Sequence, residues 1–209
     1  MNDVQRKKHA ADVLRKLKKL FPHARMFLNY TTPFELLVAV MLSAQCTDKK
    51  VNEVTPELFR RFKTIDDYAQ APIRELERLV YQTGFYRAKA KHIKEAAIVI
   101  RDEYGGVLPR TMREMVSIPG VGRKTANVVL GNAYGVSEGI AVDTHVRRLA
   151  GVLGLSKEKA IPAIERDLMK LFPKKEWFRL TYYLIEYGRN YCPAKKHDHS
   201  KCPLGHSAS

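Results

Sequence analysis

The stretch from residue 118 to residue 148 constrains the fold of this chain more than any other. It contains Pro119-Gly120-Val121-Gly122, and two glycines after a proline predict a tight turn that other residues would strain. Apolar residues then recur at helical spacing on one face, namely Ala126, Val129, Leu130 and Ala133. The stretch therefore predicts a helix, a glycine hairpin and a second helix that begins near Gly122.

The predicted second helix carries a lysine in its first turn. The first N–H groups of a helix have no partners within it, so such an end attracts anions, phosphate above all. One hypothesis is that Lys124 simply binds a DNA phosphate. The other is that the helix dipole disfavours the protonated amine and makes Lys124 a nucleophile suited to Schiff-base chemistry. An ATP-binding loop is excluded, because Arg123 stands where a glycine must precede the lysine.

A carboxylate stands before the next helical pattern. Asp143 precedes a helical apolar pattern made of Val146, Leu149, Val152 and Leu153. An aspartate at this place predicts an N-cap, whose side chain accepts a backbone hydrogen bond. Capping alone explains the residue, but a cap also fixes the carboxylate in place. Asp143 is therefore a candidate for a structural role, a catalytic role or both.

The charge of the chain indicates a polyanionic partner. Among the 209 residues, Lys and Arg number 37 against 22 Asp and Glu, which gives a formal net charge of +15. Nucleic acid is the leading candidate, and an anionic membrane surface is the weaker one, because the basic residues are spread without a polybasic tail. The chain has neither a membrane-spanning apolar run nor a signal segment, so we expect a soluble intracellular protein without a membrane partner.

The rest of the chain shows helical patterns and no alternating strand pattern, so the sequence predicts an all-α fold. Thr32-Pro33-Phe34-Glu35 has the composition of a capping box with proline at the first helical position, and it predicts the start of a buried helix. Further helices are expected at residues 9–21, from Pro56, from Pro72, through Ile93 and Ile100, from Thr111, from Ser156 and at residues 176–187.

Two further segments carry candidate DNA contacts. Gln45 lies in a Ser-Ala-Gln cluster directly after the buried helix, which indicates the edge of a site, although an ordinary helix end explains it equally well. Phe85 and Tyr86 stand before a basic helix, and aromatic rings beside lysine and arginine commonly meet nucleic-acid bases and backbone. The alternative for both rings is a place in the core.

Residues 118–127 (Ile-Pro-Gly-Val-Gly-Arg-Lys-Thr-Ala-Asn) and 142–146 (Val-Asp-Thr-His-Val) resemble the helix–hairpin–helix DNA glycosylases, and within them the endonuclease III family. The similarity extends from about Phe34 to Cys202. It implies two helical domains with a DNA-binding cleft between them. We expect a six-helix domain with the hairpin at residues 26–136, and a second helical domain formed by residues 1–25 and 137–209.

The resemblance also implies roles for particular residues. Lys124 is then the attacking amine and Asp143 its carboxylate partner. Gln45 fills the gap that an extruded base leaves, and Phe85 wedges between bases, although its ring is larger than the usual leucine. Further DNA contacts are expected from Gly120, Val121, Gly122, Arg123, Thr125 and His145.

The implied function is that of a bifunctional DNA glycosylase and AP lyase in base excision repair. It would remove oxidised pyrimidines from double-stranded DNA, and would act on abasic sites, through base flipping, Schiff-base formation and β-elimination. One alternative is a helix–hairpin–helix glycosylase with another base preference, and another is a non-catalytic DNA-binding module. We expect a monomer in the cytoplasm of a prokaryotic cell, associated with the nucleoid, and no cofactor required for catalysis.

The cysteines and histidines near the end of the chain determine whether we expect a metal site there. The family usually holds a [4Fe–4S] cluster with four cysteines, and on that frame Cys192 and Cys202 match, while His199 and Ala208 stand in the other two places. Because such a cluster normally takes four thiolates, we expect it to be absent and the tail to be metal-free. A second hypothesis is a zinc ion bound by Cys192, His199, Cys202 and His206.

Overall fold

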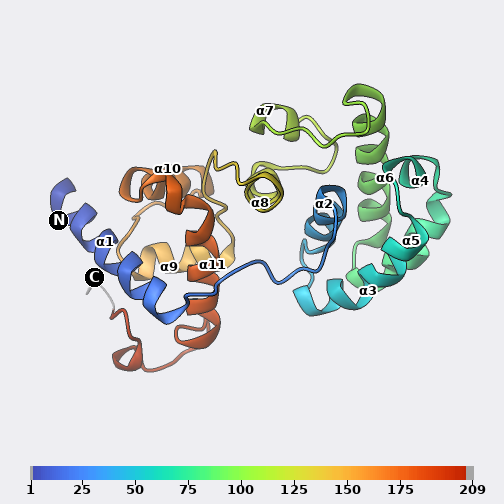
Figure 1. Ribbon diagram of the computed structural model, residues 1–209. Helices are drawn as coiled ribbons and strands as arrows, with labels where there is room; N and C mark the ends of the chain where they lie inside the picture. Colours follow the sequence, from blue (N-terminus) through green and yellow to red (C-terminus); the bar gives the residue numbers. More distant parts are fainter. Residues whose placement is uncertain (1, 206–209) are drawn as a thin grey trace. The chain divides into compact units, whose positions relative to one another are not determined.

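The computed structural model describes residues 2–205, and within that range it contains helices and no strand (Figure 1). The predicted all-α fold is therefore confirmed. In chain order the helices are α1 (Asp3–Leu20), α2 (Pro33–Leu42), α3 (Asp48–Arg61), α4 (Ile65–Gln70), α5 (Ile73–Val80), the 3-10 helix η1 (Tyr81–Thr83), α6 (Tyr86–Glu103), α7 (Met112–Met115), α8 (Arg123–Tyr134), α9 (Thr144–Val152), α10 (Ile161–Leu171), α11 (Lys174–Asn190) and the 3-10 helix η2 (His199–Lys201).

The chain divides into two compact units. The central unit is Phe27–Val136 and holds α2 to α8. The terminal unit joins the residues up to Met26 with those from Ser137 onward, so that α1 packs with α10 and α11 although the whole central unit lies between them in the sequence (Figure 1). None of the helices of residues 2–205 combines the length and the apolar character that a membrane span requires.

Helix α2 is the core of the central unit. Thr32 and Glu35 form the predicted capping box, with Pro33 in the first turn, so the chain enters this helix at a fixed point. Eight of its ten residues are buried, and α3, α6 and α8 pack against it. The end of α2 therefore lies in well-packed surroundings, directly before Gln45.

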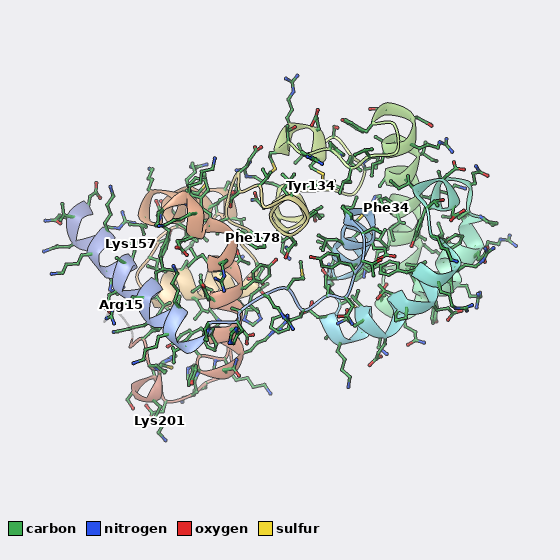
Figure 2. The ribbon with its side chains drawn as sticks, viewed as in Figure 1. Arg15, Phe34, Tyr134, Lys157, Phe178 and Lys201 are labelled. Carbon is green, nitrogen blue, oxygen red and sulfur yellow. The ribbon has the colours of Figure 1, made fainter. Side chains whose placement is uncertain are left out.

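The core of the terminal unit combines α1, α9, α10 and α11 with the tail that follows them. Leu17 of α1, Leu149 of α9 and Tyr187 of α11 are fully buried in one cluster, which also contains Cys192 and Cys202 of the tail. Charged side chains such as Arg15 project from the outer face of α1 (Figure 2). Helix α1 is therefore amphipathic, with its apolar stripe in the core and its charged side chains in solvent.

Several predicted helix boundaries are wrong. Pro56 lies inside α3, which begins at Asp48 with Thr47 as its N-cap. Proline has no backbone N–H and so removes one hydrogen bond of the helix. The helix continues because its buried face, which includes Val51 and Leu58, packs against the core. The helix predicted from Ser156 starts at Ile161, where a proline occupies the first turn. Helix α4 was not predicted, although a capping box formed by Thr64 and Asp67 starts it.

Candidate active site

The predicted helix–hairpin–helix consists of α7, a glycine-containing loop and α8 (Figure 1). Helix α8 begins at Arg123 with Gly122 as its N-cap. Val121 is only 5% exposed, and its N–H donates to the Ile118 carbonyl oxygen at 3.1 Å. The side chain and amide of Val121 thus fix the hairpin to its own unit.

The two glycines of the hairpin have different reasons to be glycine. Gly120 has a φ of +77°, and a Cβ there would lie 2.8 Å from both the His92 Cβ and the Met41 Cε. Gly122 has a φ of −87°, and a Cβ there would meet nothing within 4 Å. The prediction that both positions would be strained by a side chain is therefore wrong for Gly122. Its bare backbone instead leaves the N-terminus of α8 open to a close ligand.

Lys124 lies in the first turn of α8, and its side chain is exposed. Gly122 has no side chain with which to cap this helix, so the positive end of the helix dipole faces outward beside an amine. Arg123 is also exposed, and Thr125 is half-buried. The arrangement offers an accessible primary amine next to a surface that favours phosphate.

Asp143 is the N-cap of α9, as predicted, and it is half-buried. Its Oδ1 accepts a hydrogen bond from the Val146 N–H at 2.8 Å. The segment before it is fixed by two side chains of the same unit, because the Ile140 N–H donates to Glu165 Oε1 at 3.2 Å and Thr181 Oγ1 donates to the Ala141 carbonyl at 2.9 Å. The carboxylate is thereby held in one position, with one oxygen engaged in the cap.

Lys124 belongs to the central unit, whereas Asp143 belongs to the terminal unit. The two side chains that the sequence singled out therefore belong to different units. Lys124 follows the first residue of α8, and the Asp143 carboxylate caps the start of α9.

Gln45 and Phe85 share an unusual backbone conformation. Among the described residues, these two are the non-glycine residues with a positive φ, at 53° and 48°. Phe85 is 66% exposed, so the alternative of a place in the core is wrong for this ring. Gln45 is exposed as well. Left-handed backbone at a bulky residue persists only where its surroundings enforce it, and it is concentrated at functional sites.

Lys89 connects the two segments that carry these residues. Its side chain is only 6% exposed, and Nζ donates to the Leu42 carbonyl at 2.8 Å and to the Thr83 carbonyl at 2.7 Å. Burial lowers the pKa of Lys89 from its usual range. A buried ammonium needs compensating hydrogen bonds, and here two backbone carbonyls supply them.

His145 lies in the first turn of α9 and is half-buried. Its Nδ1 lies 2.6 Å from the position that a Cβ on Gly188 of α11 would take. The glycine therefore makes room for the imidazole ring within the terminal unit. A DNA contact from His145 stays a prediction.

Comparison with known proteins identifies the family. The sequence profile of the HhH-GPD superfamily of base excision DNA repair proteins matches residues 38–174. Endonuclease III of Synechocystis sp. is 47% identical over 96% of this chain and 92% of the relative. Endonuclease III of Bacillus subtilis is 46% identical over 91% and 87%. The chain belongs to the endonuclease III family.

Solved structures of endonuclease III share the fold. One, described as a trapped endonuclease III–DNA covalent intermediate, matches with a TM-score of 0.90 at 43% identity, over 95% of this chain and 93% of that one. A non-covalent endonuclease III–DNA complex matches with the same TM-score and identity. A thermostable thymine-DNA glycosylase has a TM-score of 0.82 at 20% identity and so shows the fold alone. The resemblance drawn from the sequence motifs is confirmed.

The prediction of a metal-free tail without a cofactor is wrong. Cys192, His197, His199 and Cys202 each offer one ligand atom, and these four atoms all lie within 4.8 Å of one another. Two thiols and two imidazoles at this separation are able to hold a metal ion. His197 belongs to the group, although the sequence analysis left it out, and His206 of the alternative zinc set lies outside the described residues.

The cluster in the tail is built on the core of the terminal unit. Cys192, two residues after the end of α11, is fully buried, and Cys202 is 5% exposed. Cys202 Sγ lies 3.4 Å from His197 Nε2 and 4.0 Å from His199 Nδ1. Burial raises the pKa of the Cys202 thiol, and the nearby Cys192 thiol adds to this.

Some side chains that position the site were not singled out from the sequence. Lys89 stands four residues before Ile93, on the apolar stripe of its helix, and a lysine at such a position signals a buried ammonium. His197 stands two residues before His199, but it lies at none of the four cysteine positions of the family, so the sequence did not single it out. Glu165 and Thr181 gave no signal, because their partners are backbone atoms of a distant loop.

Proposed function

We propose that this chain is a bifunctional DNA glycosylase and AP lyase of base excision repair, and that it removes oxidised pyrimidines from duplex DNA. The observation that carries the proposal is the exposed Lys124 amine in the first turn of α8. A relative with 43% identity was trapped in a covalent complex with DNA, and such a complex requires a protein nucleophile. The net charge of +15 suits a DNA partner.

The target nucleotide must leave the stack before any side chain reaches its C1′ atom. We assign Phe85 and Gln45 to the vacated stack, because both are exposed and both are held in a left-handed conformation. The open backbone at Gly122 and the first turn of α8 bind a phosphate beside the lesion. Arg123 and Thr125 extend this phosphate contact.

The chemistry proceeds through Lys124. The Nζ lone pair forms a bond to C1′, the glycosidic C1′–N bond breaks, and the damaged base leaves with a proton. Opening of the sugar ring gives a Schiff base between Nζ and C1′. Loss of a proton from C2′ then breaks the C3′–O bond, which cuts the strand on the 3′ side, and hydrolysis of the Schiff base releases the lysine.

Asp143 supports this step as a fixed carboxylate. It accepts the proton that makes the Lys124 amine nucleophilic, and it stabilises the positive charge that develops on the sugar. The hydrogen bonds from Thr181 and to Glu165 keep the segment before it in place, so the carboxylate needs little reorganisation during the reaction. Because the substrate is chromosomal DNA, we place the chain in the prokaryotic cytoplasm with the nucleoid.

Borohydride trapping tests the proposal. The chain is incubated with duplex DNA that carries a thymine glycol, reduced, and separated on a denaturing gel. We expect a covalent adduct in the wild type and in Lys63→Gln, an exposed lysine of the same unit, and none in Lys124→Gln. An adduct that persists in Lys124→Gln would show that another amine, and not Lys124, is the nucleophile. No adduct with either a thymine glycol or an abasic site would leave a monofunctional glycosylase or a DNA-binding module.

A further inference from the structure

The geometry of the tail suits one metal ion. Around a tetrahedral zinc with bonds of roughly 2.0–2.3 Å, neighbouring ligand atoms lie about 3.3–3.8 Å apart. The separation of Cys202 Sγ from His197 Nε2, 3.4 Å, already falls in this range, and all four ligand atoms lie within 4.8 Å. A set of two thiolates and two imidazoles is typical of zinc, whereas the family's cluster normally takes four thiolates.

The surroundings of the ligands support the same assignment. His197 Nδ1 lies 2.8 Å from the Lys195 carbonyl oxygen, which places the proton on Nδ1 and leaves the Nε2 lone pair toward Cys202. Histidines that bind metals almost always donate their other N–H in this way. Arg148 Nη1 also donates to Cys192 Sγ at 3.5 Å, so this sulfur has a fixed position within the terminal unit.

The four ligands differ in solvent exposure, and the exposed one gives an ion access to the site. Cys192 and Cys202 are buried against the core, His197 is half-buried and His199 is exposed. An ion can therefore approach from the side of His199 and be closed off by the thiolates. A metal at this place would join the short η2 turn to the end of α11.

We propose that Cys192, His197, His199 and Cys202 bind a single zinc ion, which fixes the tail on α11. The site differs from the set predicted from the sequence, because His197 takes the place of His206. Its contribution is to stability, since both thiolates belong to the core of the terminal unit.

Metal analysis of the full chain tests this proposal. The chain is purified without a histidine tag from medium with both zinc and iron, in the presence of a reductant, and its metals are measured by mass spectrometry. We expect about one zinc per chain in the wild type and much less in Cys192→Ser, Cys202→Ser and His197→Gln. Cys46→Ser, the third cysteine, and His206→Gln should keep the zinc. The cobalt-substituted chain should show the visible spectrum of a tetrahedral thiolate site.

Three results would overturn the zinc site. Iron together with acid-labile sulfide would show a cluster instead. No metal, with Cys192 and Cys202 joined as a disulfide after purification without reductant, would show a redox pair. Zinc that persists in His197→Gln but disappears in His206→Gln would show that His206, and not His197, is the fourth ligand. Circular dichroism of each variant separates a lost ligand from a lost fold.

A second, independent inference concerns Lys89. Leu42 is the last residue of α2 and precedes Gln45 by three residues, while Thr83 ends η1 and precedes Phe85 by two. One buried ammonium donates to the carbonyls of both, at 2.8 and 2.7 Å. Among residues 2–205, the two non-glycine residues with left-handed backbone therefore follow segments that are held by the same atom.

We infer that Lys89 is a positioning residue that sets the spacing between Gln45 and Phe85 for base extrusion. This inference rests on the proposed function. The strain at both residues requires rigid support, and a bond network from one side chain keeps the two segments at a fixed separation. Without the ammonium, two buried carbonyls lose their donor and the segments relax independently.

Lys89→Met removes the donor while keeping most of the side-chain volume. Lys94→Met is the matched control, because Lys94 lies on the same helix and donates to the Ala71 carbonyl at 2.7 Å, away from both segments. The readout is the fluorescence of 2-aminopurine opposite a thymine glycol, which reports extrusion. We expect the extrusion rate to fall about tenfold to a hundredfold in Lys89→Met and not in Lys94→Met, with partial rescue by Lys89→Arg.

A double-mutant cycle separates positioning from general destabilisation. If Lys89 acts through Gln45 and Phe85, Lys89→Met should add little to the loss already caused by Gln45→Ala with Phe85→Ala. Additive losses, or extrusion unchanged in Lys89→Met, would refute the inference. A wild type that extrudes and cleaves no lesion would instead refute the proposed function, so the two failures are distinguishable.

Discussion

The two glycines of the hairpin give the sharpest test of the structural argument, because they differ in what alanine would meet. At Gly120, alanine must adopt a left-handed conformation, which costs about 1–2 kcal/mol, at a φ of +77°. Its Cβ also lies 2.8 Å from the His92 Cβ and the Met41 Cε. The methionine terminus can move, but the His92 Cβ is held by α6, so overpacking adds roughly 1–3 kcal/mol.

Gly120→Ala should therefore lower the free energy of unfolding by about 2–5 kcal/mol. At Gly122 the φ of −87° suits alanine and no atom lies within 4 Å of its Cβ. Gly122→Ala should change stability by less than about 1 kcal/mol, because the restriction of the unfolded chain is offset by the poorer N-cap that alanine provides. Its effect should appear instead in DNA affinity, since a methyl group would stand where a phosphate approaches.

Urea unfolding and fluorescence anisotropy with an abasic-site duplex measure the two effects on the same samples. We expect Gly120→Ala to lower the free energy of unfolding and Gly122→Ala to lower the affinity for DNA. Equal stability of Gly120→Ala and the wild type would refute the conformational argument. Undiminished DNA affinity in Gly122→Ala would refute the role of the open backbone at the start of α8.

Three further predictions concern the wedge, the carboxylate and the electrostatics. Phe85→Gly should not lower the thermal midpoint, because glycine adopts the left-handed backbone freely, yet it should slow base extrusion measured with 2-aminopurine. Thr181→Val should cost about 1 kcal/mol in urea unfolding and lower kcat at unchanged DNA affinity, because the segment before Asp143 loses a hydrogen bond. The logarithm of the DNA binding constant should fall linearly with the logarithm of salt concentration, and Arg123→Gln should make the slope shallower by about 1; identical slopes would exclude a phosphate contact from Arg123.

The helices of this chain were predictable where a local signal starts them. The capping box at Thr32 and the cap at Asp143 depend on residues within one turn, and the structure has both. Pro56 misled the prediction, because proline in a first turn and proline in a stable amphipathic helix look alike in sequence. The short α4 was missed because six residues give little periodicity.

The candidate site was predictable to a different extent in each part. The motifs around Lys124 and Asp143 are contiguous, so the residues and their helix starts follow from sequence. The left-handed backbone of Phe85 has no sequence signal, because a bulky residue disfavours it everywhere. The tail misled the prediction, since counting thiolates on the family's frame left no place for His197.

The sequence by itself determined what depends on neighbouring residues: an all-α chain, a glycine hairpin before a lysine, an aspartate that caps a helix and a charge suited to DNA. Tertiary structure alone decided what depends on distant ones. Lys89 reaches the end of α2 from 47 residues away, and Thr181 reaches the segment before Asp143 from 40 residues away. The four metal-binding side chains converge only because the tail folds back on α11. Such contacts are set by packing, which no local pattern encodes.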